Sequence, residues 1–65
     1  MEPFYCLVHR AGEVPDLWLL TADTESEALD EIARREPEWR PFRKAELYQG
    51  ERRIRIFAGP EGTLA

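Results

Sequence analysis

Hydrophobic and polar residues alternate in the second half of the chain, in the segments RKAELYQ (43–49) and RRIRIFA (52–58). Because residues two apart in a strand share a face, this alternation predicts two strands. Between them, either Gln49-Gly50 or Gly50-Glu51 fits a two-residue hairpin loop in which glycine supplies the positive φ. The pattern therefore predicts an antiparallel hairpin.

Two segments of the first half are almost wholly apolar, FYCLVHR (4–10) and LWLLTA (17–22). Their aromatic and β-branched residues predict strands. The short connection around Gly12 and Pro15 favours an antiparallel pair. Neither segment alternates cleanly, so the sequence leaves open which of their residues face the core.

The segment DTESEALDEIARREPEW (23–39) carries the signals of a helix. Thr24 and Glu27 form a capping box, in which the threonine oxygen accepts from the Glu27 amide and the glutamate side chain reaches back to the Thr24 amide. Pro37 disfavours helical geometry at Glu36, so we expect the helix to end there. Four apolar residues at helical spacing predict its inner stripe: Ala28, Leu29, Ile32 and Ala33.

The order of these elements predicts a fold of the α+β class, β-β-α-β-β, with a four-stranded antiparallel sheet and one helix packed on one face. A single domain would span residues 1–58, and residues 59–65 would form a flexible C-terminal tail. The residues predicted to form the core are Leu29, Ile32, Ala33, Trp39, Leu47, Ile54 and Ile56.

One helix can cover only one side of such a sheet, whereas the first two strands are apolar on both sides. Strands of that kind are usually buried on both faces, so something else must cover the far side. We expect that face to carry part of the set Tyr5, Leu7, Trp18, Leu20, Tyr48 and Phe57, rimmed by Lys44, Arg53 and Arg55. Aromatic residues with arginine at their edge are typical of protein interfaces. The candidate interface residues are Trp18, Tyr48, Arg53, Arg55 and Phe57.

The length of the chain also favours an interface on the uncovered face of the sheet. A domain of 65 residues has a marginal core. A single cysteine excludes an internal disulfide, and one cysteine with one histidine cannot build a Cys/His zinc site. Packing and self-association, as a homodimer, remain as sources of stability. The alternative is that the tail and the segment EPEWRPF (36–42) close off the apolar face within a monomer.

Candidate catalytic chemistry is sparse. Cys6 and His9 are three apart on a predicted strand, so they point to opposite faces and do not form a nucleophile–base pair. The sequence contains no glycine-rich phosphate loop, no CxxC and no HExxH motif. We therefore predict a protein that is not an enzyme, with no metal, no cofactor and no small-molecule substrate.

Charge is divided unevenly along the chain. Residues 1–38 carry ten acids and three bases, and residues 39–65 carry three acids and six bases, which gives −7 and +3 and a net charge of −4. An alternative function is therefore an acidic inhibitor that blocks a nucleic-acid-handling complex through its helix. The residues expected to carry it are Glu27, Asp30 and Glu31, on a solvated helix face.

Direct binding of nucleic acid is disfavoured, because nucleic-acid binders are usually basic overall. The weaker hypothesis of this kind is single-strand binding, with bases stacked on Tyr48 and Phe57 near Arg53 and Arg55.

The N-terminus MEPFYCLVHR has an acid and a proline where a signal peptide would be basic, and its apolar run is too short to span a bilayer. We expect a cytoplasmic protein of bacterial or phage origin without membrane contact.

The segment EALDEIARREPEWRPFRKAELYQGERRI (27–54) resembles small bacterial proteins of no assigned activity, in which an Ala-rich helix precedes a strand of the type ELW-x-G-x-R-x-I. Tyr48 stands where that pattern has tryptophan. The chain is also similar in size and acidity to small phage inhibitors of host defence, anti-CRISPR proteins among them. The residues that carry the strand pattern are Glu46, Leu47, Tyr48, Gly50, Arg52 or Arg53, and Ile54.

Overall fold

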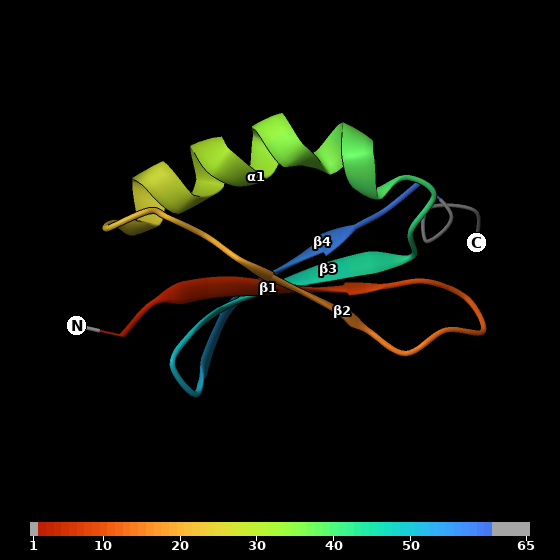
Figure 1. Ribbon diagram of the computed structural model, residues 1–65, viewed down its shortest axis with the longest axis horizontal. Helices are drawn as coiled ribbons and strands as arrows, with labels where there is room; N and C mark the ends of the chain where they lie inside the picture. Colours follow the sequence, from red (N-terminus) through yellow and green to blue (C-terminus); the bar gives the residue numbers. More distant parts are fainter. Residues whose placement is uncertain (1, 61–65) are drawn as a thin grey trace.

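A computed structural model describes residues 2–60 of the chain. Its elements, in chain order, are β1 (Phe4–His9), β2 (Asp16–Leu19), α1 (Glu25–Trp39), β3 (Lys44–Gln49) and β4 (Arg52–Ala58). The four strands form one antiparallel sheet in the order β2-β1-β3-β4, and α1 lies across one face of it (Figure 1). The predicted α+β fold is confirmed.

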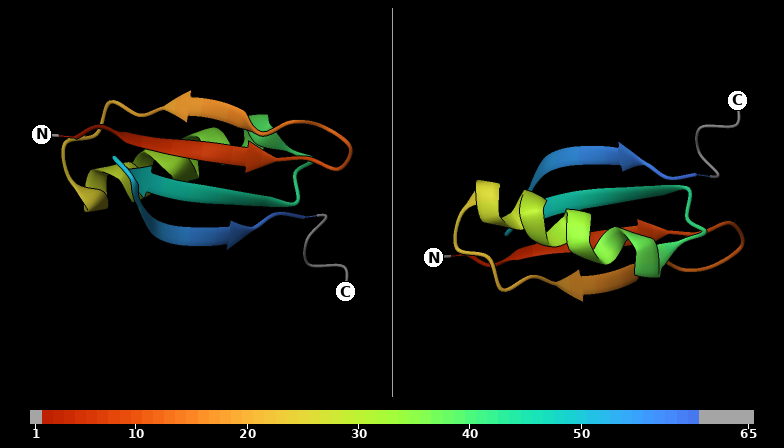
Figure 2. Two further views of the ribbon diagram at one scale, coloured as in Figure 1. Left: turned by 90° about the horizontal axis from the view of Figure 1, so that it is seen from below. Right: turned by 90° about the horizontal axis from the view of Figure 1, so that it is seen from above.

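β1 and β3 are the central strands of the sheet, and β2 and β4 are its edges. The connection through α1 therefore leads from the edge strand β2 to β3, which pairs with β1. Seen from above, α1 crosses the sheet obliquely from β3 over β1 toward β2 and leaves β4 to one side (Figure 2, right). Seen from below, α1 lies behind the strands, and the opposite face of the sheet has no second layer over it within residues 2–60 (Figure 2, left).

The β3–β4 hairpin closes through Gly50 and Glu51, because Gln49 pairs with Arg52. Gly50 has a φ of 61°, which an L side chain rarely adopts. A Cβ there would also lie 2.2 Å from a carboxylate oxygen of Glu2. The glycine expected to form the turn is therefore required by its backbone conformation, whereas the exposed Glu2 side chain could move aside.

A β-bulge interrupts the pairing of this hairpin. Leu47 pairs with Arg55 and the next residue, Tyr48, pairs with Arg53, so Ile54 is the extra residue of β4. Side chains before and after the bulge no longer follow one simple alternation. This irregularity determines which face each residue after Ile54 occupies.

The helix begins as the sequence predicts. Thr24 is the N-cap, and its side-chain oxygen accepts from the Glu27 amide at 3.2 Å. The Glu27 carboxylate accepts from the backbone amide of Asp23, at 2.9 Å, instead of from that of Thr24. Both side chains thus satisfy free amides at the helix start, with one partner shifted by a residue.

The expected end of the helix at Glu36 is wrong, since α1 continues through Pro37 to Trp39. Proline at this position removes an amide donor and crowds the Ala33 carbonyl, and we attribute the continuation of the helix to the burial of Trp39. The Trp39 ring lies between those of Trp18 and Phe42, with centroids 5.8 and 6.2 Å away. Arg10 Nη2 donates to the Trp39 carbonyl at 3.1 Å, which satisfies a free acceptor at the helix end.

The core lies between α1 and the sheet. Ile32, Trp39 and Leu47 are buried there as predicted, and Leu29 and Ile54 pack against it in part. Ala33 and Ile56 are exposed, so their assignment to the core is wrong. The buried apolar residues are Phe4, Cys6, Val8, Leu20, Ala28, Ile32, Trp39, Phe42, Ala45 and Leu47.

The inner stripe of the helix differs from the predicted one. Among residues 2–60, the buried positions of α1 are Ala28, Glu31, Ile32 and Trp39, which rotates the inner face away from Ala33. Glu31 replaces an apolar residue on this face because its carboxylate has partners there.

Beyond the last strand, Gly59 is buried and its amide donates to the Arg43 carbonyl at 2.8 Å. Residues 61–65 of the expected tail lie outside the described residues.

Candidate functional site

The candidate site is the sheet face turned away from α1, called here the open face. The strand register arranges its side chains in rows, because residues paired across strands share a face. One row carries Leu19, Tyr5, Tyr48 and Arg53, from β2 to β4. The next row carries Leu17, Leu7, Glu46 and Ile56, and the last carries His9, Lys44 and Ala58.

Large apolar side chains lie exposed at both edges of the open face. Leu17 and Leu19 of β2 are 59% and 65% exposed, and Ile56 of β4 is 51% exposed. Tyr5 and Leu7 of β1 are half-buried between these edges. Three such residues on one side of a small sheet give an apolar surface that water covers in the free chain.

The two tyrosines of the open face form one rigid unit. Tyr5 and Tyr48 pair across β1 and β3 with their rings stacked, at 5.2 Å between centroids and 4° between planes. The Tyr5 hydroxyl donates to the Gly50 carbonyl at 2.9 Å. The pair therefore presents a fixed aromatic surface beside the hairpin turn.

An ionic network crosses the middle of the open face. The Glu46 carboxylate meets His9 Nε2 at 2.5 Å and Arg53 Nη1 at 3.2 Å, and Glu46 is almost fully buried. Burial alone would raise the pKa of this carboxyl, but the hydrogen bonds from His9 and Arg53 hold its pKa below the ordinary value. The central charge of the face is thus already satisfied within the chain.

Two of the five predicted interface residues lie on this face, Tyr48 and Arg53. The facing predicted for Trp18, Arg55 and Phe57 is wrong. Trp18 pairs with Cys6 and contacts Trp39 under the helix. Phe57 packs against the core.

The bulge explains two of these three differences. Because Ile54 is an extra residue, Arg55 pairs with the inward-facing Leu47 and Phe57 with the inward-facing Ala45. Arg55 lies 4.0 Å from Glu25 of α1, measured between Nε and Oε2. The same shift turns Ile56 out onto the open face. The aromatic pair expected to stack bases, Tyr48 and Phe57, is thereby divided between two faces.

Leu20 of the expected face is buried in the core, whereas Lys44 lies on the open face beside His9. The apolar residues that sequence reasoning assigned to the wrong side or left open are Leu17, Leu19 and Ile56. For the first strand a signal existed, because His9 shares its face with Tyr5 and marks the solvent side. β2 carried no equivalent signal, since Asp16 shares the inner side with Trp18.

The acidic helix presents fewer carboxylates than predicted. Glu27 and Asp30 are exposed, whereas Glu31 is only 4% exposed, so its placement on a solvated face is wrong. The Glu31 carboxylate accepts from the amide and hydroxyl of Thr21, at 3.0 and 3.2 Å, and from Arg35 at 3.2 Å. Burial would raise the pKa of Glu31, and these bonds lower it below the ordinary value. Glu31 therefore ties the segment after β2 to the helix.

Cys6 and His9 lie on opposite faces of β1, as predicted. Burial raises the pKa of the Cys6 thiol to about 12, with a smaller contribution from the negative charge of Glu31. The thiol is therefore protonated at neutral pH and a poor nucleophile. Cys6 acts as a small core residue.

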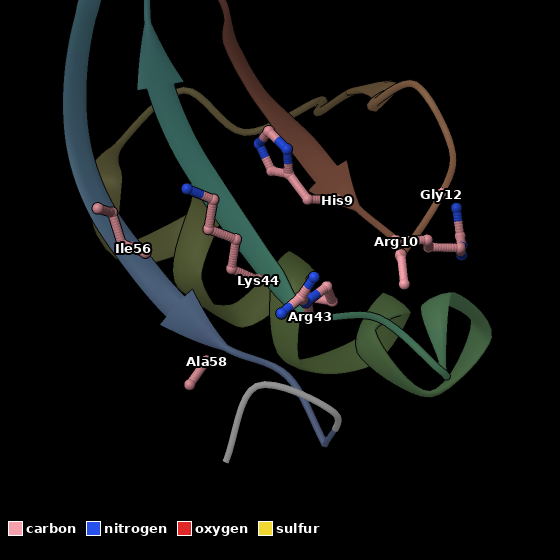
Figure 3. A pocket seen from close by; sticks show the side chains of 8 residues that line it. His9, Arg10, Gly12, Arg43, Lys44, Ile56 and Ala58 are labelled. Carbon is pink, nitrogen blue, oxygen red and sulfur yellow. The ribbon is translucent and has the colours of Figure 1, made fainter. Parts of the chain in front are cut away.

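A shallow basic hollow of about 700 Å³ lies at the end of the sheet where β1 and β4 end and β3 begins (Figure 3). Its side chains include those of His9, Arg10, Arg43 and Lys44, with Ile56 and Ala58 on the β4 side. Arg10 is engaged by Asp16 and by the Trp39 carbonyl. This hollow adds positive charge to the rim of the open face.

Within residues 2–60, no group of three or more His, Cys, Asp and Glu side chains is placed to hold a metal ion. The helix found in the same part of the chain is too short and too polar to cross a bilayer.

Comparison of the chain with protein-family models, curated proteins and solved structures found no match. The resemblance to small bacterial proteins and to phage inhibitors stays a prediction.

Proposed function

We propose that this protein is a non-catalytic interaction module that forms a homodimer through its open face. The observation that carries the proposal is the exposure of Leu17, Leu19 and Ile56 on a side of the sheet that α1 does not cover. Pairing two such faces removes these side chains from water, which contributes about 25 cal/mol for each Å² of apolar surface buried. A sheet-on-sheet dimer also covers the face of the sheet that α1 leaves open.

The charged groups of the open face are compatible with burial. Glu46 is bonded to His9 and Arg53, so it brings no unpaired charge into an interface. Lys44 and the other basic groups of the hollow lie at one end of the face, where they stay in contact with water as a rim. A partner need not provide a counter-charge at the centre.

The distribution of apolar residues suits a two-fold axis. Leu17, Leu19, Tyr5 and Leu7 gather on β2 and β1, whereas the charged residues gather on β3 and β4. A two-fold axis in the plane of the interface, running across the strands, sets β1 and β2 of one copy against the same strands of the other. Apolar side chains then meet apolar side chains.

The proposal is tested by light scattering during size-exclusion chromatography over a wide range of concentrations. The wild-type chain is expected to elute as a dimer that dissociates on dilution. Leu19→Glu should give a monomer at every concentration, because it places an unpaired charge among the apolar side chains that the dimer would bury. Leu19 is exposed, so the variant should retain its fold, which circular dichroism checks.

Val14→Glu is the matched control. Val14 is 82% exposed but lies in the β1–β2 connection, outside the strands. The control should dimerise like the wild type. A wild-type chain that stays monomeric at all concentrations, or a Val14→Glu variant that dissociates as readily as Leu19→Glu, would overturn the proposal.

The alternative, an acidic inhibitor acting through α1, has weaker support. Glu27 and Asp30 remain available for it, while Glu31 is held by Thr21 and Arg35. The alternative predicts that Asp30→Lys abolishes association with a nucleic-acid-handling complex and leaves the oligomeric state unchanged. The dimer proposal predicts the opposite sensitivity, at Leu19.

A further inference from the structure

We propose that the outer edge of β4 binds an extended peptide segment as an antiparallel fifth strand, and that this segment carries apolar residues followed by acidic ones. The site is the outer backbone of β4 and the groove on its helix side, and only Arg53, Ile56 and Ala58 are shared with the open face. This inference therefore goes beyond the proposed dimer. It depends on three features of β4: its free backbone, the apolar groove beside it and its arginines.

Among residues 2–60, the backbone of β4 is paired on one side only. β4 is the last strand of the sheet, and its described neighbour is β3 alone. The Gly59 amide donates to the carbonyl of Arg43, the residue before β3, so by strand alternation the peptide groups of Phe57 and Arg55 also point toward β3. Those of Ile56 and Ala58 point outward. Outward amides and carbonyls of this kind are the template for strand addition.

An apolar groove of about 560 Å³ accompanies this edge on the helix side. It exists because α1 runs over the centre of the sheet and leaves the inner side of β4 uncovered (Figure 2, right). Leu29, Ile32 and Ala33 form its helix wall, and Phe57 forms part of its floor. A strand added to β4 would place every second side chain toward this groove.

The charges of β4 select the kind of strand. Arg55 lies at the groove and Arg53 on the open face, so an added strand meets one guanidinium on each side. Phe57 and Ile56 follow, again one on each side. An antiparallel segment with two adjacent apolar residues and then two adjacent acids matches this order.

Two other occupants fit less well. β4 contains no acidic residue, so a second copy of β4 offers no carboxylate to Arg53 or Arg55. β2 of a second copy offers only four residues, Asp16–Leu19, and its Asp16 is engaged by Arg10. An acidic and apolar segment of another protein is the occupant that the charges favour.

The test uses a synthetic peptide, end-capped and carrying a fluorescent label, that contains threonine, two valines, two glutamates and threonine in that order. Its binding to the full chain is measured by fluorescence anisotropy and by exchange of backbone amides in NMR. We expect saturable binding that weakens with salt, and slower exchange at the amides of Ile56 and Ala58. Absence of binding would overturn the proposal.

Two control peptides separate the contributions. Replacing both glutamates by lysine should abolish binding, because the peptide then repels Arg53 and Arg55. N-methylation of the peptide amides that face β4 keeps every side chain but removes main-chain donors, and it should abolish the exchange protection. Equal binding of the N-methylated peptide would show groove binding without strand addition and would overturn the proposal.

The matched protein variants are Arg55→Gln and Arg34→Gln. Arg55 lines the groove, whereas Arg34 is exposed on α1 and does not line it. Arg55→Gln should lower the affinity for the glutamate peptide by roughly tenfold, and Arg34→Gln should leave that affinity unchanged. Leu19→Glu, which changes the open face, should bind the peptide as the wild type does. Failure of the dimer proposal and failure of this one are therefore distinguishable.

Discussion

His9 and Glu46 are joined across β1 and β3 by a 2.5 Å contact between Nε2 and Oε1, on the side of the sheet that the helix leaves open. Glu46 is nearly inaccessible to water although it lies on the open face. Its position is tolerated because Arg53 from β4 completes its hydrogen bonding. The network thus links the three strands β1, β3 and β4 on the open face.

The lowered pKa of Glu46 predicts acid destabilisation. A carboxyl whose folded pKa lies below its ordinary value of 4.5 contributes stability that is fully present above 4.5 and is lost as the pH falls through the folded value. Urea unfolding from pH 7 downward should therefore show stability falling below pH 4.5. Glu46→Gln should lower stability at pH 7 by about 1–2 kcal/mol and flatten this acid slope.

Glu51→Gln is the control for this measurement, since Glu51 lies exposed in the hairpin turn. Its acid slope should match that of the wild type. A Glu46→Gln variant with an unchanged slope would contradict the assignment, because Glu31 would then carry the acid sensitivity alone.

Glu31 and Asp30 are neighbours on α1 with opposite expected effects. Glu31→Ala removes an acceptor from the Thr21 amide and from Arg35, and should destabilise the fold by about 2 kcal/mol. Asp30→Ala is an exposed change and should stay within about 0.5 kcal/mol. Denaturant titration of both variants at pH 7 checks the difference. Equal effects would contradict the inward position of Glu31.

The class of the fold could be predicted because its signals are local. The Thr24–Glu27 cap, Gly50 between two alternating segments, and Gly12 with Pro15 between apolar runs each define one boundary. The end of the helix could not be predicted in the same way. Its continuation through Pro37 depends on the burial of Trp39 against Trp18 and Phe42, which are distant in sequence or follow the helix.

The candidate site could be predicted only in part. Tyr48 and Arg53 lie between the hairpin turn and the bulge, so simple alternation places them correctly. Arg55 and Phe57 come after Ile54, and one extra residue reverses the faces that alternation predicts. The inward turn of Glu31 likewise depends on Thr21 in a different segment. Long-range pairing, which no local pattern encodes, decided these positions.

The bulge can be tested by labelling cysteines in β4. Ile56→Cys should react rapidly with a thiol reagent at pH 8, because Ile56 lies exposed on the open face. Phe57→Cys should react slowly, since Phe57 packs against the core. The wild-type Cys6, buried and with a pKa of about 12, should contribute little background. Uninterrupted alternation from Ile54 predicts the reverse order of rates, and that order would contradict the bulge.

The two stacked tyrosines give a prediction with a built-in control. The Tyr5 hydroxyl donates to the Gly50 carbonyl at 2.9 Å, whereas Tyr48 contributes its ring to the same stack. Tyr5→Phe should therefore destabilise the fold by about 1 kcal/mol, the usual net value of a hydrogen bond of this kind. Tyr48→Phe keeps the stack and should change stability by less than about 0.5 kcal/mol. Thermal unfolding of the two variants measures both effects, and a larger loss for Tyr48→Phe would show that the hydroxyl of Tyr48, not that of Tyr5, secures the hairpin turn.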